Sequence, residues 1–185
     1  MTYLLMGLFL FLGTHSISIF AQPLRDRFAA KSELGWKAVY SLLSLAGMVL
    51  IIKGYSEARL NPTLIYVSPY WLRHVSALLM LPVFILFLAP YFPGKITTLI
   101  KHPQLSAVLL WASAHLLVNG NCADLLLFGS FLTWAAADIF SMKYRISRQP
   151  PGLKKSARND IVIVISGLAL YLLFAVYLHR ILLGV

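Results

Sequence analysis

Long apolar runs, separated by short polar segments, make up most of this chain. Six runs come close to the length of about 20 residues that an α-helix needs to cross the hydrocarbon of a bilayer. They cover residues 2–20, 36–53, 70–90, 104–119, 123–141 and 160–182. The pattern predicts an all-α fold, a polytopic transmembrane bundle of about six helices, in a single domain covering residues 1–185.

The segments between the runs contain residues that break helices. Pro62 and Pro69 come before the third run, and Pro90 and Pro93 come at its end or soon after it. The sequence Asn119-Gly120-Asn121 between the fourth and fifth runs is a turn signal. We therefore expect the fourth and fifth runs to form a hairpin of two apolar helices.

Composition supports a membrane protein. Hydrophobic residues make up 59% of the chain and charged residues 12%, with a mean hydropathy of +0.79. Soluble domains are about 45–50% apolar and about 25% charged. The 16 Lys and Arg against 6 acidic residues would indicate nucleic acid binding in a soluble protein. In a membrane protein such residues gather in cytoplasmic loops, so the predicted partner is the lipid bilayer and not nucleic acid.

The basic residues predict how the chain is oriented. With six spans, the first, third and fifth loops lie on one side of the membrane. These loops contain Arg25, Arg27, Lys31, Lys37, Lys95, Lys101, Lys143, Arg145, Arg148, Lys154, Lys155 and Arg158. The other side has Lys53, Arg59, Arg73 and Arg180. The positive-inside rule then predicts a multi-pass membrane protein with both termini outside and the basic loops in the cytoplasm. The first run lacks a basic segment before it and is interpreted as a retained helix, not a signal peptide.

Two histidines lie inside apolar runs, His15 in the first and His115 in the fourth. An ionisable side chain within a span is costly, so it marks a candidate functional site. Neutral imidazole offers a lone pair without a charge to bury, which makes histidine a common ligand of metals and haem iron. Two such rings on facing helices can hold a planar cofactor. The structural alternative is a hydrogen bond between helices.

The remaining histidines are near the ends of runs. His102 lies between Lys101 and Pro103, where proline suits the first position of a helix. We interpret it as a residue of the membrane interface, and we interpret His74 and His179 as contacts to lipid headgroups. His74 and His102 are also kept as alternative ligands.

Polar residues gather at the predicted hairpin turn. Asn119, Asn121 and Asp124 could close the turn, with Asp124 capping the next helix. Their functional alternative is to orient the ring of His115. Trp111 lies one turn before His115 on the same helix face. Cys122 is the single cysteine of the chain, so no disulfide can form within it.

Two blocks of sequence resemble the NnrU family of small bacterial membrane proteins and, through it, the plant 15-cis-zeta-carotene isomerase. The first block includes Thr14-His15-Ser16, Pro23-Leu24-Arg25-Asp26 and Leu34-Gly35. The second includes Lys101-His102-Pro103-Gln104, Leu110-Trp111-Ala112-Ser113-Ala114-His115 and Asn119-Gly120-Asn121. The resemblance covers most of the chain.

The resemblance implies a haem b between the first and fourth spans, with His15 and His115 as the two iron ligands. It also implies the bacterial inner membrane, where the predicted orientation places both termini in the periplasm. The resemblance further implies a link to denitrification and nitric oxide metabolism, with denitrification enzymes as candidate partners. Catalytic residues remain unknown. If the protein is an enzyme, the leading prediction is a haem-dependent isomerase acting on an apolar, polyene-like substrate. Ala112 stands where the isomerase has a cysteine ligand, so a ligand-switching mechanism lacks its partner here.

A further alternative is a membrane methyltransferase of the isoprenylcysteine type, which the Lys101-His102-Pro103 motif resembles. Those enzymes have more acidic and arginine residues near the C-terminus than this chain has.

The predicted depths of the two buried histidines differ. His15 is about 13 residues from the outer end of its run and His115 about four, which at 1.5 Å per residue is a difference of roughly 14 Å. The main prediction for the two iron ligands is the pair of His15 and His115. Two alternative pairs remain, His115 with His74 and His15 with His102.

Overall fold

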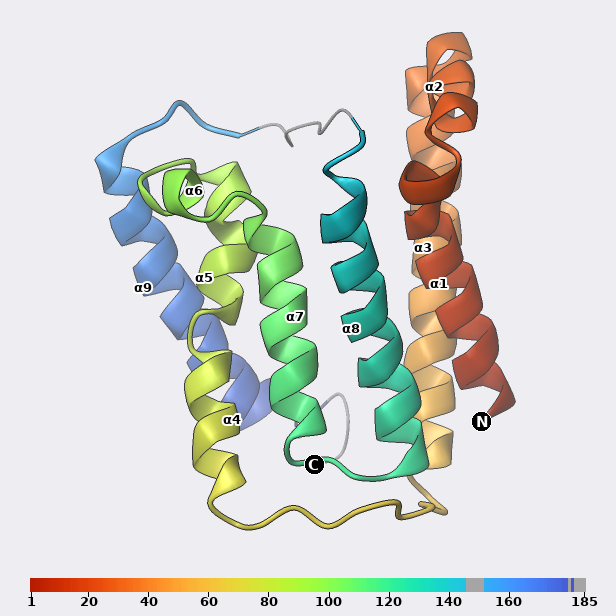
Figure 1. Ribbon diagram of the computed structural model, residues 1–185, viewed down its shortest axis with the longest axis vertical. Helices are drawn as coiled ribbons and strands as arrows, with labels where there is room; N and C mark the ends of the chain where they lie inside the picture. The colour runs from red at the N-terminus through yellow and green to blue at the C-terminus, as the bar shows by residue number, and fades with distance from the viewer. Residues whose placement is uncertain (146–151, 180, 182–185) are drawn as a thin grey trace. The chain divides into compact units, whose positions relative to one another are not determined.

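The computed structural model describes residues 1–145, 152–179 and 181, and these residues form helices without any strand (Figure 1). The helices are α1 (Thr2–Phe20), α2 (Gln22–Lys31), α3 (Glu33–Ala58), α4 (Leu72–Met80), α5 (Val83–Leu88), α6 (Ile96–Leu99), α7 (Pro103–Leu116), α8 (Cys122–Ser141) and α9 (Ala157–Leu173). A 3₁₀ turn, η1 (Ala89–Tyr91), follows α5, and a π-helical turn, η2 (Phe174–Leu178), follows α9. The prediction of an all-α transmembrane fold is confirmed.

Five helical segments of the described chain are long and apolar enough to cross a membrane. They are Thr2–Phe20, Glu33–Ala58, Leu72–Tyr91, Cys122–Ser141 and Ala157–Leu178. The fourth predicted span corresponds to α7, which has only 14 residues. At 1.5 Å per residue it extends about 21 Å, against about 30 Å of hydrocarbon. The prediction that both termini face the periplasm requires α7 to count as a crossing, and it stays a prediction. Arg148, Arg180 and the predicted end of the last run at residue 182 lie outside the described residues.

The chain divides into two compact units. Unit 1 comprises Met1–Tyr66 and Gly120–Trp134, and unit 2 comprises Val67–Asn119 and Ala135–Val185. Each unit is described by itself below, and the expectation of a single domain stays a prediction.

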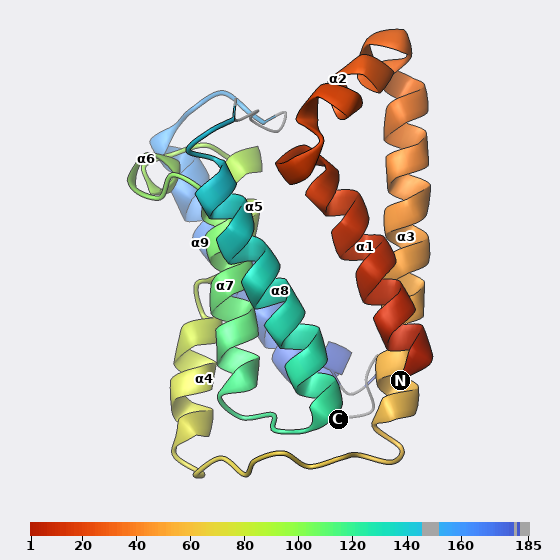
Figure 2. The same cartoon turned by 45° about the vertical axis from the view of Figure 1, so that its right-hand side comes forward.

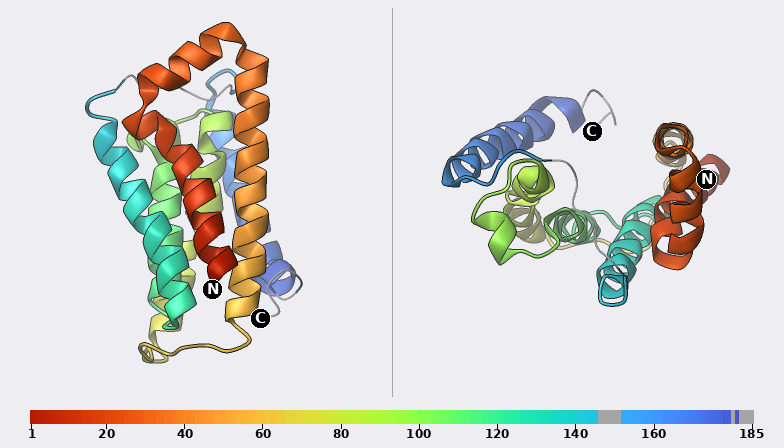
Figure 3. Two further views of the ribbon diagram at one scale, coloured as in Figure 1. Left: turned by 90° about the vertical axis from the view of Figure 1, so that its right-hand side faces the viewer. Right: turned by 90° about the horizontal axis from the view of Figure 1, so that it is seen from above.

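Unit 1 is built on the close packing of α1 against α3, which lie side by side (Figure 3, left). Glycines allow the two backbones to approach each other. A Cβ atom on Gly7 would lie 2.5 Å from the backbone nitrogen of Ile51, and one on Gly47 would lie 2.8 Å from that of Phe11. At Gly54 an added Cβ would overlap the backbone of Leu4. Small residues at such contacts are typical of helix pairs in membranes, where close backbone packing replaces hydrophobic burial.

The short polar helix α2 connects α1 to α3 (Figure 2). The hydropathy pattern predicts a loop here, between the first two spans, whereas the structure forms a helix of ten residues. Pro23 lies in the first turn of α2, where its missing N–H costs nothing. Ser32 then caps α3, its hydroxyl accepting a hydrogen bond from the backbone N–H of Gly35 at 3.0 Å.

Unit 2 packs α4, α5, α7 and α9 around a small apolar core. Val83, Leu86 and Ala107 form its buried centre. The predicted third span is divided at Pro82 into α4 and α5, since proline cannot donate the helical hydrogen bond. Helix α9 lies against α5 (Figure 3, right), where a Cβ on Gly167 would lie 2.8 Å from the backbone nitrogen of Ile85.

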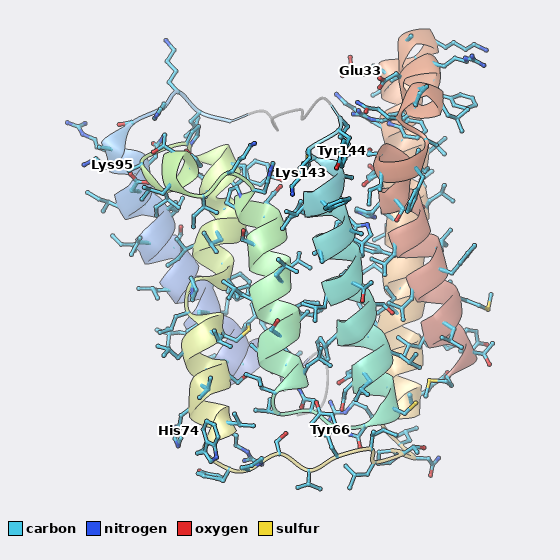
Figure 4. The ribbon with its side chains drawn as sticks, viewed as in Figure 1. Glu33, Tyr66, His74, Lys95, Lys143 and Tyr144 are labelled. Carbon is cyan, nitrogen blue, oxygen red and sulfur yellow. The ribbon has the colours of Figure 1, made fainter. Side chains whose placement is uncertain are left out.

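Side chains that the sequence assigns to opposite membrane faces lie at opposite ends of unit 2. Lys95 and Lys143 lie at one end and His74 at the other (Figure 4). At the lysine end, the carboxylate of Asp160 accepts hydrogen bonds from the backbone N–H groups of Lys95 at 2.8 Å and Ile96 at 3.2 Å. This arrangement fits the predicted grouping of the third and fifth loops on one membrane face.

The contact of α1 with α3 predicts a position-specific loss of stability. Gly54→Val should lower the free energy of unfolding by roughly 1–3 kcal/mol, because the added methyl groups overlap the backbone of α1. Gly13→Val is the control on α1, since a Cβ there meets nothing within 4 Å. Thermal unfolding in detergent measures both variants. Equal unfolding temperatures for the two would contradict this packing.

Candidate cofactor-binding histidines

His15 is held by its own helix in a defined tautomer. Its Nδ1 atom lies 2.8 Å from the carbonyl oxygen of Phe11, one turn earlier in α1. A carbonyl can only accept a hydrogen bond, so Nδ1 donates the proton. The lone pair of the neutral ring is then on Nε2, the nitrogen that points away from the helix backbone and can bind a metal.

Aromatic rings from three helices of unit 1 surround His15. The ring of Phe11 in α1 stacks on it at 4.2 Å between centroids. Tyr40 of α3 lies at 5.2 Å, and Trp134 of α8 meets it edge-on at 5.9 Å. No motif in the sequence singles out Phe11, Tyr40 or Trp134 for this place. The spacing of Phe11 four residues before His15 was the one signal that could have indicated part of this cluster.

Two buried polar atoms of unit 1 are Trp134 Nε1 and Ser44 Oγ. Neither has a hydrogen-bond partner among the described residues. A buried donor without an acceptor costs about 1–3 kcal/mol. Trp134 is also the ring that meets the edge of His15. An indole N–H at this place is therefore suited to an acceptor atom of a bound molecule.

His115 repeats the arrangement of His15 in unit 2. Its Nδ1 atom lies 2.8 Å from the carbonyl oxygen of Trp111, one turn earlier in α7. The two rings have centroids 5.4 Å apart. The carbonyl oxygen of His115 in turn accepts the backbone N–H of Asn119 at 2.9 Å. Trp111 thus orients His115 through both its carbonyl group and its ring, while Asn119 closes the end of the helix.

A second imidazole lies beside His115. The ring centroid of His179 is 6.0 Å from that of His115, with 42° between the planes. Sequence analysis interpreted His179 as a headgroup contact because it is close to the C-terminus. The structure instead brings its half-buried ring to α7 of the same unit.

The other two histidines lie close to the starts of helices. His74 is exposed near the start of α4, and its ring meets that of Tyr70 at 5.8 Å. His102 precedes α7, with Pro103 at the first helical position as expected. Burial of the ring and the charge of Lys101 lower the pKa of His102, while Asp138 acts in the opposite direction. The lower pKa favours the neutral form of the His102 ring.

The acidic residue of the predicted hairpin turn has a structural role in unit 1. Asp124 is buried, and its Oδ1 accepts a hydrogen bond of 2.6 Å from the hydroxyl of Tyr55 in α3. Its Oδ2 accepts a hydrogen bond from the backbone N–H of Asn121 at 3.0 Å, which is one of the two bonds of a capping box. Next to it, the N–H of Cys122 donates to the carbonyl oxygen of Thr63 at 2.8 Å. Asp124 thus ties the start of α8 to α3, which matches the capping interpretation.

His15 belongs to unit 1 and His115 to unit 2. Their pairing on one iron stays a prediction, as do the pairs of His15 with His102 and His115 with His74. Within the described ranges no group of three or more His, Cys, Asp and Glu side chains could hold a metal ion. Ala112, one turn before His115, is fully buried and offers no ligand atom.

A family model described as NnrU protein matches residues 3–185. No curated protein and no solved structure matches the chain. The match covers nearly the whole chain, including both histidine environments.

The bond between Tyr55 and Asp124 predicts a measurable contribution to stability. Tyr55→Phe removes a hydroxyl that donates to a buried carboxylate, and this should cost about 1–3 kcal/mol. Tyr3→Phe is the matched control, because Tyr3 is 39% exposed on α1. Thermal unfolding in detergent should show a lower midpoint for the first variant alone. An unchanged midpoint for Tyr55→Phe would show that this bond does not hold α8 to α3.

Proposed function

Because the chain belongs to the NnrU family, we propose that it is a haem b-binding protein of the bacterial inner membrane. His15 and His115 are the proposed axial ligands of the iron. The proposed role is in redox or nitric oxide chemistry that supports denitrification enzymes, as the resemblance to this family implies.

One observation supports the proposal most strongly: both histidines have the same hydrogen bond. In each, Nδ1 donates to the carbonyl oxygen four residues earlier, at 2.8 Å. This bond fixes the tautomer and the ring orientation, as it does for most histidines that bind metals. It also makes the ring a better electron donor through Nε2. The Nε2 atoms of the two neutral rings are suitable ligands for haem iron, which takes neutral imidazole.

The surroundings of His15 fit a flat, largely apolar group. Phe11, Tyr40 and Trp134 present ring faces and edges to it. The buried N–H of Trp134 could donate to a polar atom of the bound molecule. When bound, haem supplies one-electron exchange or a position for a diatomic gas. The residues of the chain hold the imidazole rings in place and provide this buried donor.

The identity of residue 112 favours a redox role over isomerisation. Ala112 is fully buried on α7. The isomerase that the family resembles has a cysteine at this place as an alternative iron ligand, and an alanine methyl group cannot replace it. The proposal therefore assigns no polyene substrate.

The proposal predicts a haem spectrum that depends on His115. Protein purified in detergent after haem-replete expression should give a Soret band and the sharp reduced bands of six-coordinate haem. His115→Ala should lose these features, because it removes a proposed ligand. His102→Ala tests the other candidate partner of His15 and should keep these features, since its ring lies before α7 and not within it. A wild-type protein without a Soret band would rule out the proposed function.

A further inference from the structure

The position of His179 is set by an unusual turn of the last helix. Residues Phe174–Leu178 form the π-helical turn η2, which continues α9 and ends at His179. π-Helical turns are rare and occur frequently at functional sites. Each one places an additional residue in a turn and so shifts the following side chains around the helix axis.

Contacts along α9 show which face packs on the rest of unit 2. Gly167 approaches Ile85, the Tyr171 hydroxyl donates to the carbonyl oxygen of Ala77 at 3.4 Å, and Phe174 meets Phe84 at 5.0 Å between centroids. Gly167 and Tyr171 of α9 and Phe174 at the start of η2 are spaced by four and three residues, as in an α-helix. The regular helix would next place Leu178 on this face.

The π-helical turn places His179 on this face instead. The rings of Phe174 and His179, five residues apart, have centroids 6.4 Å apart. The same ring of His179 lies 6.0 Å from that of His115. The irregular turn therefore brings a second imidazole to His115 within one unit.

The spacing of the two rings fits a shared metal. Nδ1 of His115 is bonded to Trp111, which makes Nε2 the coordinating atom. A metal–imidazole bond is about 2.0–2.1 Å, so two imidazoles on opposite sides of one metal have ring centroids roughly 6 Å apart. The distance between the rings of His115 and His179 is 6.0 Å.

We propose that His179 is an axial ligand of the haem iron that can occupy the position opposite His115 in place of His15. This inference rests on the proposed function, since it assigns a third ligand to the same haem. It gives unit 2 a pair of imidazoles that can hold the iron without a ligand from unit 1.

The test compares single and double variants of the full-length protein. Electron paramagnetic resonance of the ferric form separates low-spin iron with two imidazoles from high-spin iron with one. His15→Ala should keep the low-spin signal through His179, and the double variant His15→Ala/His179→Ala should lose it and become high-spin. The double variant His15→Ala/His74→Ala tests the other candidate partner of His115. It should stay low-spin because His74 is exposed beside Tyr70, and a high-spin signal from it would assign the second ligand to His74 and overturn the inference.

The outcomes separate the inference from the function on which it depends. A high-spin signal from His15→Ala alone would overturn the inference and leave the proposed function standing. A double variant that stays low-spin would also overturn it. Absence of haem from the wild-type protein would contradict both the proposed function and the inference about His179.

Discussion

The proposed chemistry depends on the hydrogen bond between an imidazole and the backbone of its own helix. A histidine inside lipid must satisfy its N–H group without water. In α1 and α7 the carbonyl oxygen four residues earlier does this, at 2.8 Å in both helices. The bond needs no partner helix, so each ring is oriented before anything binds to it. It also directs the second ring nitrogen away from the backbone, where it can bind a metal.

The neighbouring elements support these two rings in different ways. In unit 1, glycine contacts bring α1 close to α3, and the bond between Tyr55 and Asp124 ties α8 to α3. These contacts allow Tyr40 and Trp134 to reach His15 from two other helices. In unit 2, Trp111 orients His115, and the π-helical turn after α9 brings His179 to it. Aromatic rings thus surround His15, whereas His115 has a second histidine, His179, beside it.

Hydropathy predicts the apolar helices well, because the bilayer requires a long apolar run for each crossing. It misses features that depend on local geometry. Pro82 divides the third predicted span, and the polar helix α2 has no apolar face that a hydropathy pattern could detect. His15 and His115 are found because polar atoms are rare in such runs. Tyr40 and His179 are missed because their roles come from contacts between distant segments, and His179 also depends on a five-residue turn that helical periodicity does not predict.

The central claim is that His15 and His115 both hold their proton on Nδ1. Nitrogen NMR of haem-free protein with ¹⁵N-labelled histidine, reconstituted in a bilayer, measures this directly when compared with His15→Ala and His115→Ala samples. The account predicts a protonated Nδ1 and an unprotonated Nε2 for both rings. Protonation of Nε2 at either position would contradict it.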